Sequence, residues 1–203
     1  MNKKLIIVLL VGVLVGSIAV IAIRAALYRP LSVHYHANYG LFIDGKQDTF
    51  DSFTHYEEVQ ACRGENTNDP KERGHMHQPN NHVVHVHASA VTWSDLFSSI
   101  GYGLSDKAVT TTDKVYVDGQ DNKTLTFILN GQTVKTIANK VIGDKDMLLI
   151  SYGTDDSTTL KTQYDSVPKD AEEVDKAADP ASCGGTEKVT LSSRLKHAIN
   201  FSN

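Results

Sequence analysis

Residues 33–43 read VHYHANYGLFI, and residues 83–88 read VVHVHA. Aromatic and β-branched side chains dominate both stretches, which is typical of β-strands. Successive side chains of a strand point to opposite faces of the sheet, so residues two apart share a face. We therefore expect His34 and His36 to point the same way, and His85 and His87 to do the same.

The elements around these strands predict an α+β domain: one mixed or antiparallel sheet with a packed helix. The turn pairs Asp44-Gly45 and Asn130-Gly131 favour hairpins because they tolerate the positive φ angles of tight turns. Thr92 is a typical helix cap, and the order of hairpin, helix and later strands resembles a β-grasp variant. The expected elements are a hairpin over 33–50, a short helix over 54–62, a strand over 83–88, a helix over 92–100, a strand over 114–117, a hairpin over 125–137 and a buried strand over 147–152.

A long apolar run near the N-terminus predicts a membrane anchor. Residues 5–23 contain no charged side chain. As a helix they would extend about 28 Å, close to the thickness of a bilayer's hydrocarbon core. The alternative is a signal peptide cleaved after Ala25, but its apolar stretch is normally shorter, and Arg24 stands where a small residue is favoured. Basic residues flank the run on both sides, so the expected extracytoplasmic location of the following chain depends on the signal-like N-terminus.

The predicted organisation has three parts. They are residues 1–30, a cytoplasmic start with the anchor helix; residues 31–153, the histidine-rich domain; and residues 154–203, a polar tail. The tail is rich in Asp, Ser, Thr, Lys and Ala, so we expect it to be extended or partly disordered. Leu191, Leu195 and Ile199 line one side of a short C-terminal helix that could pack on the domain, bind a partner or touch the bilayer.

The chain after the anchor is acidic. The first 30 residues hold four of the 20 basic residues and no acidic residue, which leaves 16 basic against 24 acidic residues and a net charge of −8 with histidine neutral. This charge argues against nucleic acid and against an anionic membrane surface as partners. It is compatible with the collection of cations, and equally with simple solubility.

The two cysteines, Cys62 and Cys183, allow one disulfide in an oxidising compartment. The bridge would close a loop of about 120 residues and add roughly 4–5 kcal/mol to stability in the chain-entropy model. Two unpaired thiols are one alternative. A metal ligand is another, because His55, Glu58 and Cys62 would share one face of the expected helix over 54–62.

Eight of the nine histidines lie between His34 and His87, and six of them form three His-x-His pairs. If the strands over 33–43 and 83–88 are neighbours and face together, four imidazoles converge, and imidazole is a preferred ligand of Zn²⁺ and Cu²⁺. A polar loop over 63–81 would carry a further pair, with Met76 as a thioether suited to Cu⁺. The expected inner ligands of this copper or zinc site are His34, His36, His85 and His87, and the secondary ligands are His75, His77 and His82. The alternatives are a pH-responsive surface and no special role.

Catalytic motifs do not accompany the histidines. The zinc-protease pattern, the nucleophile elbow, the P-loop and the dinucleotide fingerprint are absent. Cupins require a Glu shortly after the histidine pair, where this chain has Val91, and a site like that of carbonic anhydrase would need a third histidine from His34 or His36. A catalytic zinc would also need an acid or base such as Glu57 or Glu58, which nothing selects. The sequence thus favours a metal-binding domain over an envelope interaction module or a zinc-dependent hydrolase or lyase.

Three motifs carry a family resemblance: HYHANYGLFIDG at 34–45, VVHVHASAVTWSDLF at 83–97 and DMLLISYG at 146–153. The stretch from His34 to Gly153 resembles an uncharacterised family of single-span, histidine-rich envelope proteins of bacteria and archaea. The resemblance implies a membrane anchor and an external histidine-rich domain. It implies no particular activity.

Overall fold

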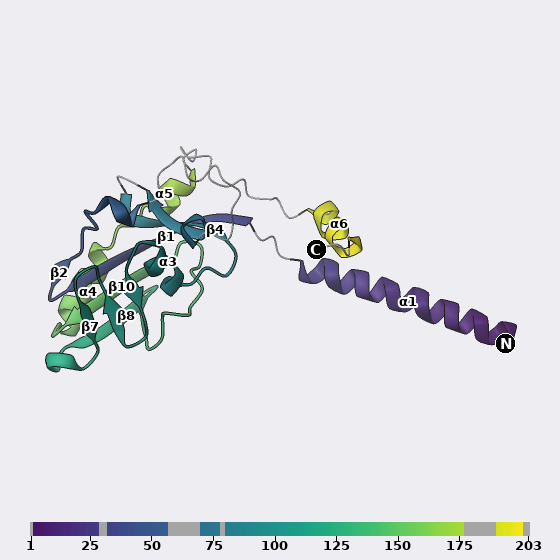
Figure 1. The fold of residues 1–203 in the computed structure, drawn as a ribbon, viewed down its shortest axis with the longest axis horizontal. Helices are drawn as coiled ribbons and strands as arrows, with labels where there is room; N and C mark the ends of the chain where they lie inside the picture. The colour runs from purple at the N-terminus through teal and green to yellow at the C-terminus, as the bar shows by residue number, and fades with distance from the viewer. Residues whose placement is uncertain (1, 29–31, 57–69, 78–79, 177–189, 201–203) are drawn as a thin grey trace. The chain divides into compact units, whose positions relative to one another are not determined.

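The structure, a computed structural model, describes residues 2–28, 32–56, 70–77, 80–176 and 190–200. The chain divides into two compact units, Met1–Leu31 with Glu187–Asn203, and Ser32–Thr186. The first unit contains helices α1 (Lys3–Leu27) and α6 (Leu191–Ile199), and the second contains the β-sheets and the other helices (Figure 1).

Helix α1 is long and apolar enough to cross a membrane. Its most apolar window has a mean hydropathy of 3.2, and no part of that window is buried within the structure. A helix that is apolar on every side suits a bilayer, because all its interior backbone groups are paired within the helix. The observed helix extends a few residues beyond the predicted run over 5–23 at both ends.

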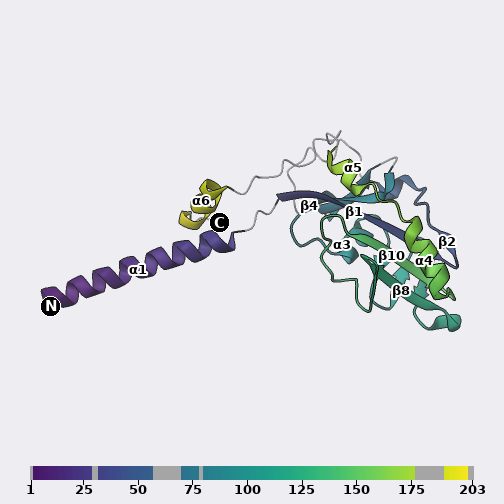
Figure 2. The same cartoon turned by 180° about the vertical axis from the view of Figure 1, so that it is seen from behind.

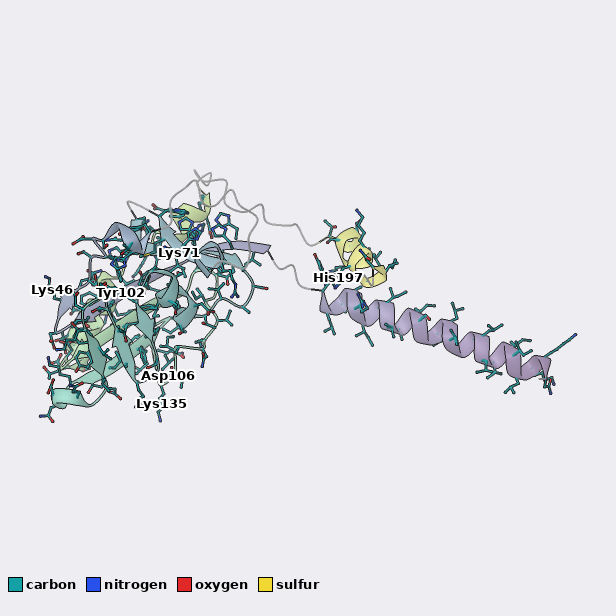
Figure 3. The ribbon with its side chains drawn as sticks, in the orientation of Figure 1. Lys46, Lys71, Tyr102, Asp106, Lys135 and His197 are labelled. Carbon is teal, nitrogen blue, oxygen red and sulfur yellow. The ribbon has the colours of Figure 1, made fainter. Side chains whose placement is uncertain are left out.

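Helix α6 packs against the C-terminal end of α1 through two arginines. Arg194 Nη1 donates to the carbonyl of Ala25 at 3.0 Å. In return, Arg24 Nη2 donates to the carbonyls of His197 at 3.2 Å and Asn200 at 3.0 Å. The last carbonyls of a helix have no intrahelical partner, so each arginine caps the other helix. Figure 3 labels His197 beside this end of α1. The C-terminal helix predicted from the sequence is confirmed.

The second unit is built on a mixed sheet. In the described residues it has seven strands in the order β3-β4-β1-β10-β8-β9, with β2 paired to the second half of β1. Strands β1 and β10 run parallel, and the remaining pairs are antiparallel. The strands are β1 (Ser32–Ile43), β2 (Lys46–Gln47), β3 (Gly74–His77), β4 (Asn80–Ala88), β8 (Thr124–Leu129), β9 (Gln132–Val134) and β10 (Met147–Gly153). The predicted α+β class is confirmed, and the β-grasp resemblance stays a prediction.

One face of this sheet forms the main core. Helix α3 (Trp93–Ser99) lies in front of it in Figure 1 and buries Trp93, Leu96 and Phe97. Thr92 and Asp95 form the predicted capping box at its start. A second sheet of three short strands adds Leu104 and Val109 to the same core; its strands are β5 (Gly103–Leu104), β6 (Ala108–Thr110) and β7 (Val115–Val117). The predicted hairpin at Asn130-Gly131 is also confirmed, with φ angles of 51° and 78°.

The opposite face of the sheet carries two helices, which lie in front of it in Figure 2: α4 (Ser157–Ser166) and α5 (Ala171–Lys176). Their segment was expected to be an extended polar tail, and in the described residues it is packed instead. Asp156 caps α4 by accepting from the Thr159 amide at 2.8 Å. Val167 then buries against Phe42 and Leu149. A few apolar contacts and a good cap outweigh the polar composition here.

The segment 70–77 also differs from the expected loop. It contains the short helix α2 (Pro70–Arg73) and the strand β3, which pairs with β4 at the edge of the sheet. Two 3-10 turns, η1 (Phe53–His55) and η3 (Gln120–Asn122), complete the order. Of the helix expected over 54–62, the structure describes residues 54–56, which lie largely in η1. The other expected site residues of that region, Glu57, Glu58 and Cys62, lie outside the described residues, and so does Cys183.

Candidate metal centre

Six histidines from three adjacent strands gather on the sheet face that α5 covers. The strand register places His75, His85 and His36 opposite one another across β3, β4 and β1. The two-residue period of a strand puts the second histidine of each pair on the same face. The six residues are His34 and His36 of β1, His75 and His77 of β3, and His85 and His87 of β4.

The six imidazoles form a closed circuit in which each ring lies beside the next. Neighbouring ring centroids are 4.4–4.9 Å apart. The order around the circuit is His34, His36, His85, His77, His75 and His87. The four strand histidines therefore converge as the sequence predicts, and a third pair joins them. That these residues bind a metal stays a prediction.

Two pairs of ring nitrogens are close enough to serve as ligands of a common ion. His36 Nε2 lies 3.0 Å from His85 Nδ1, and His75 Nε2 lies 3.1 Å from His77 Nε2. Two nitrogens bound to one tetrahedral Zn²⁺ at about 2.0–2.1 Å would be about 3.3 Å apart. These separations match a hydrogen bond between rings, and they also come within a few tenths of an ångström of a metal's ligand spacing.

Two outer contacts fix the proton positions on these rings. The carboxylate of Asp175 lies 2.5 Å from His36 Nδ1, and the backbone carbonyl of Lys71 accepts from His75 Nδ1. Figure 3 labels Lys71 above the sheet. A carbonyl and an ionised carboxylate can only accept, so each neutral ring carries its proton on Nδ1 and a lone pair on Nε2. Outer partners of this kind are typical of metal-binding histidines.

A third group, His34, His85 and His87, can hold a metal ion. One ligand atom from each lies within 4.8 Å of the others. Both ring nitrogens of His87 are buried, and neither has a hydrogen-bond partner within the described part of the chain. Leaving a buried polar atom unpaired costs about 1–3 kcal/mol. A bound ion would remove that cost by accepting a nitrogen lone pair.

The central histidines are held in the neutral form that metal binding requires. Burial lowers the pKa of His87 to about 3, with smaller effects from the neighbouring rings, chiefly His75 and His34. Burial and the surrounding imidazoles also place the pKa of His85 far below its usual range. Both rings are therefore uncharged at neutral pH, and each offers a lone pair without first losing a proton.

Helix α5 is fastened over the site by a set of side-chain contacts next to it. Asp170 accepts from Asn38 Nδ2 at 2.6 Å and from Asn80 Nδ2 at 2.9 Å. The Ala171 amide donates to Asn38 Oδ1 at 3.0 Å. These contacts tie the start of α5 to β1 and β4, so that Asp175, one helical turn later, reaches His36. The site is thus closed by a segment far away in the sequence.

Met76 is not placed to act as the expected thioether ligand. It alternates with its two histidine neighbours in β3, so its side chain points to the core face. There it is fully buried, and its sulfur accepts from the Tyr39 hydroxyl at 2.8 Å. Met76 is therefore a core residue, and the donors that the described residues bring together are imidazole nitrogens.

The remaining candidates separate into those that the cluster excludes and those that the sequence did not indicate. The strand period puts His82 on the face of Val84 and Val86, and no ring contact joins it to the cluster among the described residues. Asp175 was missed because its segment resembles a polar tail, with the run AEEVDK at 171–176 as the one helical sign. The Lys71 carbonyl has no sequence signature, because any residue could supply it.

The fold and the site together define a histidine-rich α+β domain with a cluster that could hold a metal ion, in a chain whose N-terminal helix could span a membrane. Comparisons with protein-family models, curated proteins and solved structures gave no match.

Proposed function

We propose that this protein is a membrane-anchored, extracytoplasmic domain that binds a transition metal, Cu²⁺ or Zn²⁺, through its histidine cluster. The observation that carries the proposal is the convergence of six imidazoles, with both buried nitrogens of His87 left unpaired by the described residues. A purely structural cluster would normally satisfy its buried nitrogens with hydrogen bonds. A metal ion supplies the missing partner.

The donor set selects the kind of metal. Imidazole nitrogens suit Zn²⁺ and Cu²⁺, whereas Ca²⁺ and Mg²⁺ prefer oxygen and Cu⁺ prefers sulfur. The thioether of Met76 faces the core, so it adds no soft donor. Between the two favoured ions, the general affinity order of nitrogen sites places Cu²⁺ above Zn²⁺.

The anchor would hold the site close to a membrane. Helix α1 ends at Leu27, and β1 begins at Ser32 and reaches its first histidine two residues later. A chain advances at most about 3.3–3.6 Å per residue, so the cluster could lie only a short distance beyond the end of the membrane helix. We propose that capture or delivery of the metal takes place at the membrane surface.

The described surface does not favour the alternative of an interaction module. Outside α1 and α6, the large apolar side chains exposed in the described residues are Val115, Val117 and Val141. Contact surfaces for protein partners normally show larger contiguous apolar patches. The negative charge of the chain after the anchor is compatible with attracting cations.

Metal analysis of the full chain tests the proposal. The protein is purified in detergent without a histidine tag, loaded with Cu²⁺ or Zn²⁺, dialysed and analysed for metal. We expect stoichiometric metal and an increase in melting temperature, since a ligand at a thousandfold excess over Kd stabilises by about 4 kcal/mol. The variant His85→Ala/His87→Ala should lose the metal, while the control His197→Ala should keep it. Wild-type protein without stoichiometric metal and without a thermal shift would overturn the proposal.

A further inference from the structure

The histidine cluster divides into two groups of four rings that share strand β4. Three sides of each group are short, at 4.4–4.8 Å in the first and 4.6–4.9 Å in the second, and the common side between His85 and His87 is 6.3 Å. The groups are alike in size because β4 lies between β1 and β3. The first group is His34, His36, His85 and His87, and the second is His75, His77, His85 and His87.

Each group has its own short nitrogen pair and its own outer contact. In the first, His36 Nε2 is 3.0 Å from His85 Nδ1, and Asp175 holds the far nitrogen of His36. In the second, the Nε2 atoms of His75 and His77 are 3.1 Å apart, and the Lys71 carbonyl holds the far nitrogen of His75. Six imidazoles also exceed what one four-coordinate ion requires.

The two rings of β4 are suited to serve both groups. Each imidazole has two nitrogens on different sides of the ring, and both nitrogens of His87 are buried without a hydrogen-bond partner in the described residues. The Nδ1 atom of His85 faces His36, which leaves Nε2 for another ligand. We propose that the cluster holds two transition-metal ions, one between β1 and β4 and one between β3 and β4, with His85 and His87 as shared ligands.

Sharing a ring has a defined chemical balance. A neutral imidazole binds one ion through its lone pair, and it binds a second ion with the other nitrogen after the N–H proton passes to water. The resulting imidazolate carries one negative charge. Together with the Asp175 carboxylate, it offsets the repulsion between two divalent cations on neighbouring strands. Loading of the second ion should therefore release protons, as metal binding to protonated ligands generally does.

Metal counting on the full chain in detergent distinguishes this inference, which rests on the proposed function, from that function itself. We expect two Cu²⁺ or Zn²⁺ ions per wild-type chain. The variants His34→Ala/His36→Ala and His75→Ala/His77→Ala should each retain one ion. The matched control His82→Ala/His197→Ala should retain two. One ion per wild-type chain would overturn the two-ion inference and leave the proposed function standing, whereas no bound ion would overturn both.

A spectroscopic measurement avoids reliance on variants that could fail to fold. Two Cu²⁺ ions that share an imidazole ligand are magnetically coupled, so the electron paramagnetic resonance spectrum of loaded wild-type protein should show a coupled pair. The spectrum of His75→Ala/His77→Ala, where that variant keeps its circular dichroism, should show an isolated Cu²⁺. An uncoupled spectrum from wild-type protein carrying two ions would place the second ion outside the cluster and overturn the inference.

Discussion

The carboxylate of Asp175 lies 2.5 Å from Nδ1 of His36, although 139 residues separate the two in the chain. The contact holds His36 with its proton on Nδ1, so that Nε2 faces His85 with a lone pair. Helix α5 is therefore part of the candidate metal centre even though it supplies no inner ligand.

Removal of this carboxylate should weaken metal binding without abolishing it. Outer partners of metal-binding histidines typically contribute 10–100-fold to affinity, so we expect Asp175→Ala to lose about that much. Competition with a chelator of known affinity measures the change. Glu173→Ala, on the same helix and exposed, is the matched control and should leave affinity unchanged. If both variants bound metal like wild type, the Asp175 contact would have no orienting role.

Metal-free protein should lose stability in mild acid because of the buried histidines. The pKa of His87 falls from 6.5 to about 3 on burial, and that of His85 is also lowered. Between those pH values the unfolded chain binds protons that the folded chain excludes, so the free energy of unfolding is fully present above pH 6.5 and decreases as pH falls towards 3. Urea midpoints between pH 7 and pH 4 measure the slope.

The histidine origin of that slope can be tested by substitution. Carboxylates also titrate in acid, so the comparison needs a variant. His87→Leu removes one proton-binding group, and its midpoint should depend less on pH than that of wild type. His197→Leu, at an exposed position of α6, should keep the wild-type slope. A slope in His87→Leu as steep as in wild type would show that the buried ring does not contribute.

Met76 should prove important for packing and unimportant for metal binding. It is fully buried and holds the Tyr39 hydroxyl through its sulfur. Met76→Leu conserves volume, so a cost of less than about 1.5 kcal/mol is expected, whereas Met76→Ala should cost about 2–5 kcal/mol. Metal content should be unchanged in Met76→Leu. Loss of copper from a folded Met76→Leu variant would instead identify the thioether as a ligand.

The reciprocal arginine contacts should hold α6 on the end of α1. Arg194→Ala removes the donor to the Ala25 carbonyl and leaves that carbonyl uncapped. Hydrogen bonds that involve a charged group contribute about 1.5–3 kcal/mol, and partial exposure reduces this figure, so we expect about a tenfold loss of hydrogen-exchange protection in α6. Lys196→Ala, which is exposed on the same helix, serves as the control. Equal protection in both variants would contradict this role of Arg194.

Local patterns were sufficient for much of the fold. The capping pair Thr92 and Asp95, the Asn130-Gly131 turn and the apolar run of α1 each act within a few residues, so the sequence predicts them correctly. The two-residue period of β-strands likewise put both histidines of a pair on one face. The same period also separates His82 from His85, three residues later, and could have excluded His82 before the structure was known.

The composition of the site depends on tertiary structure. By itself, the sequence determined that the histidines come in pairs that share a face. Which pairs become neighbours was decided by the strand order β3-β4-β1, because backbone pairing joins strands that are far apart in the chain. That order turned a predicted loop into β3, placed β4 between two other histidine pairs, and turned Met76 into the core. It also left room for α5, whose Asp175 reaches His36 across a distance in sequence that no local pattern can span.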